Sequence, residues 1–249
     1  MAAVLETKKL CKSFGALTVA DNIDFRLEPG ARHALIGPNG AGKTTFVNML
    51  MGALAPSSGE ILLAGEPVTH AKQYSRVRRG LARTFQVTTL FRSLPVLDNV
   101  ALGIAERDGT AMRMWRPASA HREIIEESRN LLDGLGLGDD AATRVADLPY
   151  GKQRLVEIAI ALGLKPRVLL LDEPAAGVPS HESERILQNL ERLPSDIAIL
   201  IIEHDMDLVF RFARRITVLV QGVVLVEGPP EEIARDKRVQ DVYLGEAHA

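Results

Sequence analysis

Two kinds of hydrophobic pattern alternate along this chain. Short runs of β-branched and leucine-rich residues predict strands, and apolar residues that recur every three to four positions predict amphipathic helices. Such alternation is typical of an α/β protein, which is the fold class we expect. The predicted strands cover residues 4–10, 19–27, 32–36, 60–63, 81–85, 168–171, 198–202, 216–219 and 223–227.

Two runs, residues 168–171 and 199–202, are apolar at every position. A strand with one face in water alternates apolar and polar residues, whereas the central strands of a parallel sheet are covered on both faces. We therefore expect both runs at the centre of a parallel sheet.

The middle third of the chain has the helical pattern. One helix is predicted from residue 119 to Gly134 or Gly136, and a second over residues 151–164. The apolar side of the first helix consists of Ile124, Ile125, Leu131, Leu132 and Leu135. We predict a single domain over residues 1–249, in which a helical lobe (88–164) is inserted into an α/β lobe (1–87 and 165–249).

Charge and cysteine content exclude little but set the context. The 30 Lys and Arg residues nearly balance the 32 Asp and Glu residues, so no overall attraction to nucleic acid is expected. Cys11 is the single cysteine, so no internal disulfide can form, and we predict a buried thiol in the first strand. Apolar runs such as residues 197–202 are far shorter than the roughly 20 residues that span a bilayer.

The sequence GPNGAGKTT follows the predicted strand 32–36 and precedes an apolar helical pattern. It fits the loop G-x-x-x-x-G-K-[ST], whose backbone N–H groups surround nucleotide phosphates, with the positive end of a helix dipole behind them. Lys43 would reach the β and γ phosphates, and Thr44 would offer its hydroxyl to Mg²⁺. A glycine-rich turn with an incidental lysine is the alternative. The predicted nucleotide contacts are Gly37, Pro38, Asn39, Gly40, Ala41, Gly42, Lys43, Thr44 and Thr45.

Two acidic residues end the apolar run 168–171. Asp172 at the end of a buried strand suits the Mg²⁺ held by a phosphate loop, and Glu173 could orient or deprotonate the water that attacks the γ phosphate. The alternative for each is a solvated residue at a strand end. As parts of a nucleotide site, Asp172 is predicted to be a metal ligand, and Glu173 and Lys43 are predicted to be catalytic residues.

With these motifs the whole chain resembles the ATP-binding subunit of an ABC transporter, which binds ATP and Mg²⁺. The resemblance implies a P-loop NTPase core with a mixed, largely parallel sheet, an N-terminal antiparallel β subdomain and an inserted α-helical subdomain. It makes Gln86 the glutamine that links Mg²⁺ and water to the helical lobe, His204 the histidine at the γ phosphate, and Phe14 the ring stacked on adenine. Without the other motifs, Gln86 and His204 would be interpreted as solvated residues, and core packing would explain Phe14 as well as adenine stacking does.

The chain departs from the family pattern in two places. The family usually has L-S-G-G-Q before a helix that faces the nucleotide of a partner subunit, and this chain has LPYGKQ over residues 148–153. Gly151 and the helix N-terminus remain, but Pro149 supplies neither hydroxyl nor N–H, and Lys152 offers a compensating charge. We hypothesise a weaker ATP-closed dimer. Residues 176–179 lack the usual aspartate of S-A-L-D, which puts communication between the two sites in doubt.

Several segments resemble more narrowly the ATPase subunits of branched-chain amino acid importers. They are residues 82–86, 150–151, 173–177, 202–206 and 227–245. The resemblance implies a second, identical or paralogous ATPase subunit, membrane permeases, an indirect periplasmic binding protein, no nucleic acid, and a peripheral place on the cytoplasmic face of the inner or plasma membrane. Residues that would receive a permease helix, or else form core, are Thr89, Leu90, Phe91, Leu94 and Val96.

Other classes fit less well. A lipid exporter remains the nearest alternative. A non-transport ABC ATPase normally carries two cassettes, a coiled-coil insertion or a basic face, and none is visible in this sequence. A P-loop kinase or GTPase would not need Asp172, Glu173, His204 and a helix led by Gly151 together.

Overall fold

A computed structural model describes residues 2–84, 90–110 and 118–246, without the side chains of residues 118–121, 180–181 and 244–246. The described strands are β1 (Leu5–Phe14), β2 (Leu17–Leu27), β3 (Arg32–Ile36), β4 (Ser58–Leu63), β5 (Glu66–Pro67), β6 (Leu81–Arg83), β7 (Val168–Asp172), β8 (Ala198–Ile202), β9 (Arg215–Val220) and β10 (Val223–Gly228). The described α-helices are α1 (Lys43–Met51), α2 (Gln73–Arg78), α3 (Val96–Arg107), α4 (Ala118–Gly134), α5 (Tyr150–Gly163), α6 (Ser180–Glu191), α7 (Met206–Phe212), α8 (Pro230–Arg235) and α9 (Lys237–Glu246). Short 3₁₀ helices cover Gly138–Asp140 and Val145–Asp147.

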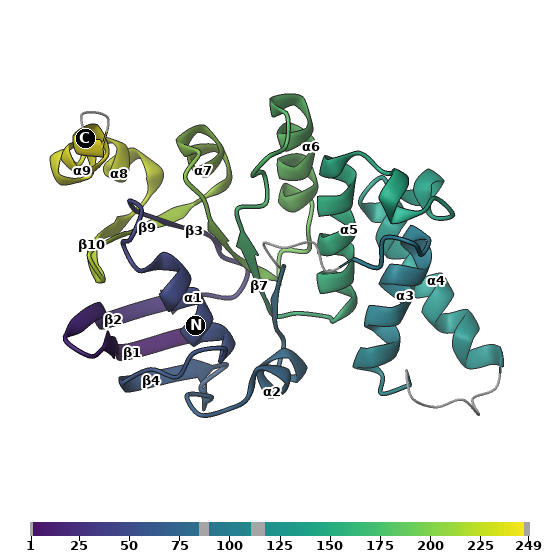
Figure 1. Ribbon diagram of the computed structural model, residues 1–249, viewed down its shortest axis with the longest axis horizontal. Coiled ribbons are helices and arrows are strands. Elements are labelled where there is room, and N and C mark those ends of the chain that lie inside the picture. Colours follow the sequence, from purple (N-terminus) through teal and green to yellow (C-terminus); the bar gives the residue numbers. More distant parts are fainter. Residues whose placement is uncertain (1, 85–89, 111–117, 247–249) are drawn as a thin grey trace.

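The larger sheet has the strand order β10-β9-β3-β8-β7-β6, and it is parallel except for the antiparallel pair β9–β10 (Figure 1). The two apolar runs form β7 and β8, and every residue of both strands is buried. This confirms the predicted central position of the runs. Because parallel strands point the same way, the carboxyl ends of β3, β7 and β8 meet at one edge of the sheet.

The smaller sheet is antiparallel, in the order β2-β1-β4-β5, and contains the N-terminal part of the chain. Helix α1 lies between the two sheets (Figure 1). Its apolar residues, with Phe46 and Leu50 among them, share one core with Leu5 of β1 and Leu170 of β7. The fold is therefore the expected P-loop NTPase type of α/β protein with an antiparallel β subdomain.

Side chains of the larger sheet alternate between two cores. Leu170 and Leu200 face α1 and the smaller sheet, whereas Leu169 and Ile201 face the other core, which also contains apolar residues of α3, α4 and α5. This follows from the period of two along a strand. The same alternation fixes which strand-end residues face α1.

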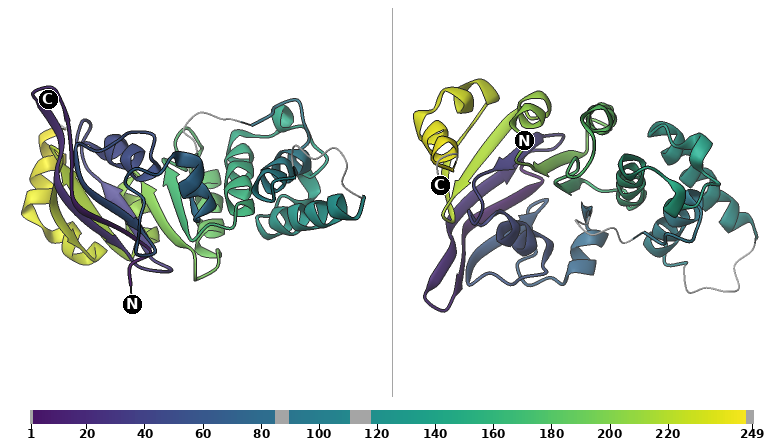
Figure 2. Two further views of the ribbon diagram at one scale, coloured as in Figure 1. Left: turned by 90° about the horizontal axis from the view of Figure 1, so that it is seen from below. Right: turned by 45° about the horizontal axis from the view of Figure 1, so that its top comes forward.

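Helices α3, α4 and α5 pack on one another at one end of the molecule in every view (Figures 1 and 2). Helix α4 ends at Gly134, one of the two predicted ends, and Gly136 follows in the left-handed region with φ +69°. Helix α5 begins one residue earlier than predicted, at Tyr150. At the opposite end, α8 and α9 pack beside β9 and β10 through the buried side chains of Ile233 and Val239.

Some local predictions need correction. Strand β1 continues to Phe14 instead of ending at residue 10, because it pairs with β2 across several register shifts. Cys11 lies in this strand but is only half-buried, and its Sγ accepts a hydrogen bond from the Asn22 N–H over 3.2 Å. Strand β5 was not predicted. No helix in the described parts of the chain is both long and apolar enough to span a bilayer.

Candidate nucleotide-binding site

Residues 37–42 connect β3 to α1 in a loop that requires bare backbone. Gly37, Gly40 and Gly42 have φ of +151°, +77° and +100°. A Cβ on Gly37 would lie 2.0 Å from the Leu219 carbonyl oxygen, and one on Gly42 would lie 2.5 Å from the Val19 carbonyl oxygen. Strands β9 and β2 therefore press against the loop, and only glycine fits these two positions.

Lys43 bends back over this loop. Its Nζ donates to the carbonyl oxygens of Gly37 over 2.5 Å and of Pro38 over 2.9 Å. No side chain among the described residues caps the N-terminus of α1, and its first turn holds no acidic residue. The first N–H groups of the helix and the ammonium group thus form a site for an anion. Of the other predicted contacts, Ala41 is buried, Asn39, Gly40 and Thr44 are exposed, and Pro38, Gly42 and Thr45 are half-buried.

Asp172 ends β7 and is buried, so it is not a solvated residue at a strand end. Its Oδ2 accepts from Arg83 Nη2 over 2.5 Å, and Arg83 Nη1 donates to Asn48 Oδ1 over 2.8 Å. Thr44 and Asn48 are four residues apart on α1 and share one face of the helix. The face of α1 that carries Thr44 is therefore turned toward Asp172.

Glu173 directly follows in strained backbone. Its φ of +47° lies in the left-handed region, which residues with a Cβ rarely adopt, and its N–H donates to the Ile202 carbonyl over 2.9 Å. The Glu173 Oε1 lies 3.6 Å from Nδ1 of His204. The fold thus brings together two residues that the sequence places in separate segments.

Glu203 is buried next to His204, and it was not predicted as a site residue from the sequence. It is 2% exposed, and it accepts from the N–H of Ala175 over 3.3 Å and of His204 over 3.2 Å. Burial raises the pKa of Glu203. The carboxylate joins the loops that follow β7 and β8, and an acidic residue directly after a fully apolar strand is the sequence signal for it.

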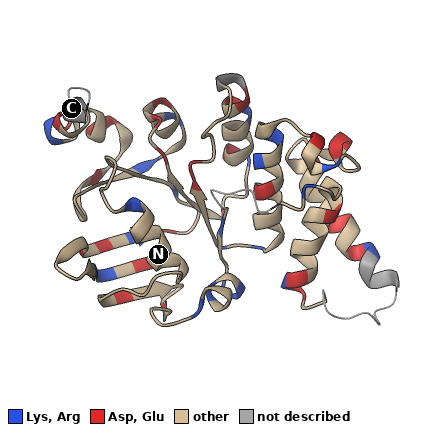
Figure 3. Ribbon diagram, in the orientation of Figure 1, with Lys and Arg blue, Asp and Glu red and all other residues tan. Residues whose placement is uncertain are grey.

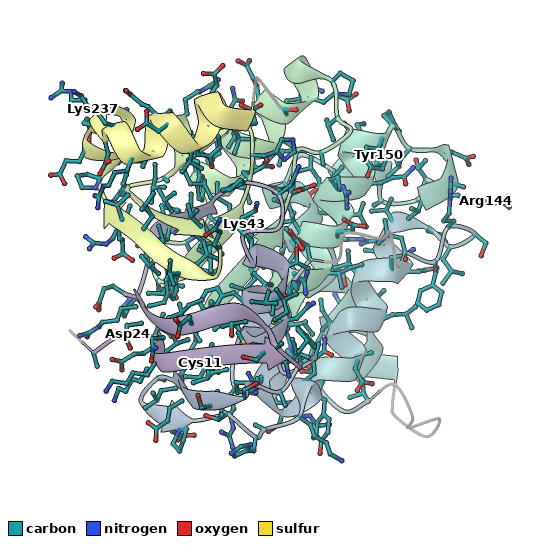
Figure 4. All side chains as sticks on the ribbon, turned by 60° about the vertical axis from the view of Figure 1, so that its left-hand side comes forward. Cys11, Asp24, Lys43, Arg144, Tyr150 and Lys237 are labelled. Atoms are coloured by element: carbon teal, nitrogen blue, oxygen red, sulfur yellow. The ribbon has the colours of Figure 1, made fainter. Side chains whose placement is uncertain are left out.

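The N-terminus of α5 lies on a different part of the molecule. Pro149 occupies the N-cap position, and the Gly151 N–H donates to Glu182 Oε2 over 3.1 Å. Lys152 pairs with Asp140 over 2.7 Å, so the expected compensating charge is already engaged within the chain. Tyr150 and Lys43 lie apart, on separate elements (Figure 4).

Phe14 is 51% exposed, so the core-packing alternative is wrong for this residue. Lys12 Nζ lies 4.9 Å from the centroid of its ring.

Within the predicted permease groove, Leu90 and Val96 are buried, Leu94 is half-buried and Phe91 is 59% exposed. Gln86 and Thr89 lie outside the described residues.

The residues present fit Mg²⁺ with a nucleotide. The hydroxyl of Thr44 and the carboxylate of Asp172 are hard oxygen donors of the kind that Mg²⁺ prefers, usually together with substrate phosphates. No group of three or more His, Cys, Asp or Glu among the described residues could hold a metal ion by itself. An ion here would depend on oxygens of a ligand bound in the glycine loop of residues 37–42.

Comparison with known proteins agrees with this geometry. Residues 20–176 match the ABC transporter family, and residues 223–249 match the branched-chain amino acid ATP-binding cassette transporter family. The chain is 36% identical to the high-affinity branched-chain amino acid transport ATP-binding protein BraF of Pseudomonas aeruginosa, over 98% of both chains. It is also 36% identical to the ribose import ATP-binding protein RbsA 1 of Rubrobacter xylanophilus, over 96% of this chain and 47% of that one.

A solved ATP-binding cassette of an ABC transporter in its ADP conformation has the same fold. It is 28% identical, with a TM-score of 0.86, and the superposition covers 98% of this chain and 100% of that one. The matched family segment spans the glycine loop of residues 37–42, helix α5 with Gly151, and the pair Asp172 and Glu173. The chain therefore belongs to the ATP-binding subunits of the ABC transporter family.

Proposed function

We propose that this chain hydrolyses ATP to power an importer for a branched-chain amino acid or a similar small solute. The observation that carries the proposal is the arrangement at one edge of the larger sheet. A loop in which Gly37 and Gly42 have no room for a Cβ leads into α1, whose N-terminus no described side chain caps, and the face of that helix is turned toward Asp172, next to Glu173.

ATP is bound mainly by the loop between β3 and α1. The Lys43 ammonium, which donates to the carbonyls of Gly37 and Pro38, exchanges these contacts for phosphate oxygens. Thr44 and Asp172 would hold Mg²⁺, which would neutralise charge on the phosphates. Phe14 offers its exposed ring to the adenine.

Glu173 acts on the attacking water as a general base, with Gln86 completing the water and metal site. Glu173 and His204 follow the carboxyl ends of β7 and β8, and their side chains lie 3.6 Å apart. The strained backbone conformation of Glu173 supports a functional role for this residue. His204 contacts the γ phosphate. Its side chain is 67% exposed and therefore has room to turn toward a ligand.

A second ATPase subunit, identical or paralogous, completes each site. Tyr150, the first residue of α5, lies apart from Lys43 within one chain (Figure 4), which supports a site that is completed by the α5 N-terminus of another chain. In a pair of chains, the α5 N-terminus of one faces the γ phosphate bound by the other. Closure and reopening of the pair drive the permeases.

The proposed solute class rests on the named relatives and on the match of residues 223–249 to the branched-chain amino acid cassette family. The proposed partners are membrane permeases and, indirectly, a periplasmic binding protein, and in this proposal the chain lies peripherally on the cytoplasmic face of the membrane. Lys and Arg are interspersed with Asp and Glu over both ends of the molecule (Figure 3). Because nucleic-acid binding calls for basic residues clustered on one face, we propose no nucleic-acid partner.

The test of hydrolysis uses Glu173→Gln. We expect the wild-type chain to release phosphate from ATP without any acceptor, and the variant to bind ATP but turn it over at least about a hundredfold more slowly. Full turnover in the variant would show that Glu173 is not the base. Phosphate release only in the presence of an acceptor would indicate a kinase instead.

The test of transport uses the chain as bait in its own cells. Co-purification with two permeases and uptake of labelled leucine, isoleucine or valine in reconstituted vesicles would support the importer. Isolation with a permease that moves lipid outward would support the lipid-exporter alternative. Labelled ribose serves as the matched negative substrate.

A further inference from the structure

Arg83 is the last residue of β6, and its side chain is engaged with the proposed metal site. The guanidinium donates to Asp172 Oδ2 over 2.5 Å, and both side chains are nearly buried, with exposed fractions of 12% and 4%. A buried carboxylate without a counter-charge would be costly. Arg83 supplies that counter-charge.

A second contact holds the guanidinium in place. Arg83 Nη1 donates to Asn48 Oδ1 over 2.8 Å. Asn48 lies on the face of α1 that also carries Thr44. One arginine thus joins α1, β6 and β7 at the point where Thr44 and Asp172 would share an ion. Its Nε is buried with no hydrogen-bond partner among the described residues. The desolvation of Arg83 is therefore incompletely compensated, and the ion pair is not a fully satisfied structural clamp.

We propose that Arg83 is the resident cation of the metal site. In this proposal, Arg83 holds the Asp172 carboxylate in the metal-free chain and competes with Mg²⁺ for it. The inference rests on the proposed function, in which Thr44 and Asp172 hold Mg²⁺. Arg83 is a positioning residue in this view and touches no reacting atom. It raises the Mg²⁺ concentration that nucleotide binding requires, and it stabilises the chain between rounds of hydrolysis.

The direction of the effect separates competition from a merely structural role. If Arg83 only supported the fold, its removal would misplace Asp172 and weaken the response to Mg²⁺. If Arg83 competes with the metal, its removal frees the carboxylate and strengthens that response. At the same time, the metal-free chain would lose stability because Asp172 is left buried without a partner.

The experiment titrates Mg²⁺ against a fluorescent ATP analogue bound to full-length chain that carries Glu173→Gln, with EDTA as the baseline. We expect Arg83→Met to reach half-maximal tightening at about fivefold less Mg²⁺. Without ligand, its melting temperature should fall by about 5 °C or more. Arg83→Lys keeps a charge and should lie closer to the parent.

Asn48→Ala is the second variant, because it loosens the guanidinium and leaves its charge in place. It should also lower the Mg²⁺ requirement, to a smaller extent than Arg83→Met, and it keeps the idea testable if Arg83→Met does not fold. An equal or higher Mg²⁺ requirement in either variant overturns the inference. If the Glu173→Gln parent itself binds ATP without any response to Mg²⁺, the proposed function falls together with the inference.

Discussion

The backbone N–H of Gly151 donates to the Glu182 carboxylate over 3.1 Å, and a Cβ on Gly151 would lie 2.2 Å from the same oxygen. An acidic side chain from α6 therefore occupies the N-terminus of α5 within one chain. In the proposed closed pair, that N-terminus receives a γ phosphate from the partner subunit. Two anions cannot share these donors, so Glu182 has to move aside.

Glu182→Ala should strengthen ATP-dependent pairing, because the Gly151 N–H no longer has an internal acceptor. In the Glu173→Gln background we expect about tenfold tighter dimerisation, as follows from one hydrogen bond to a charged group. Sedimentation with and without Mg-ATP measures the effect. The matched control is Glu184→Ala on the same helix, an exposed residue that pairs with Arg211 over 3.2 Å. Pairing that is unchanged or weaker in Glu182→Ala would contradict the prediction.

Pro149→Ser should also tighten the ATP-bound pair. Pro149 stands at the N-cap of α5 with φ −54° and ψ 150°, an extended conformation that serine adopts readily. A hydroxyl at this position adds a donor for the γ phosphate, which corresponds to about 1.5 to 3 kcal/mol. Sedimentation again gives the affinity, and Pro149→Ala separates the hydroxyl from the restored N–H. Equal dimer affinity for the serine and alanine variants would mean that the hydroxyl has no role.

Acid should destabilise the chain through His33. The ring is buried in β3, its Nε2 lies 2.8 Å from the Thr217 hydroxyl, and burial lowers the pKa of His33 to about 4. The nearby carboxylate of Glu227 opposes this shift, and Arg215 adds to it. Between the unfolded pKa of about 6.5 and the folded value, only the unfolded chain binds the proton, so stability falls as the pH falls.

The expected loss from His33 is about 3 kcal/mol between pH 7 and pH 4, and it levels off below the folded pKa. Urea unfolding across this range measures it. His33→Gln removes the titrating group and should flatten the pH dependence even if its stability at pH 7 is lower. A slope that is the same in both proteins would assign the acid sensitivity to other groups.

Arg76 should be essential for the C-terminal end of α1. It is 1% exposed, and it donates to the carbonyls of Met49 over 2.7 Å and Leu50 over 2.6 Å, and to those of Thr69 and Ala71. Burial lowers the pKa of Arg76 to about 10. Arg76→Met preserves the apolar stem but leaves these carbonyls unpaired, which should cost about 3 kcal/mol of unfolding free energy.

Chemical denaturation compares this variant with Arg79→Met. Arg79 has a side chain that is 42% exposed and lies 3.8 Å from Glu66, so its loss should cost less than about 0.5 kcal/mol. Similar stability of the two variants would show that the carbonyl contacts of Arg76 contribute little. A large loss in Arg76→Met alone would confirm them.

The sequence alone determined the parts of this protein that depend on neighbouring residues. Full apolarity over residues 168–171 and 199–202 predicted central strands, because a strand covered on both faces needs no polar position. The glycines of residues 37–42 predicted a loop of bare backbone, and the added-Cβ distances at Gly37 and Gly42 show why. Asp172 at a strand end followed from the same local pattern.

Only the tertiary structure decided how distant residues meet. The pairing of Arg83 with Asp172 requires β6 beside β7, and the approach of Glu173 to His204 requires β8 on the other side of β7. The contacts of Glu182 with Gly151 and of Arg76 with α1 depend likewise on helix packing. Hydrophobic periodicity records which face of an element is buried but not which element covers it, so these contacts became visible only in the folded chain.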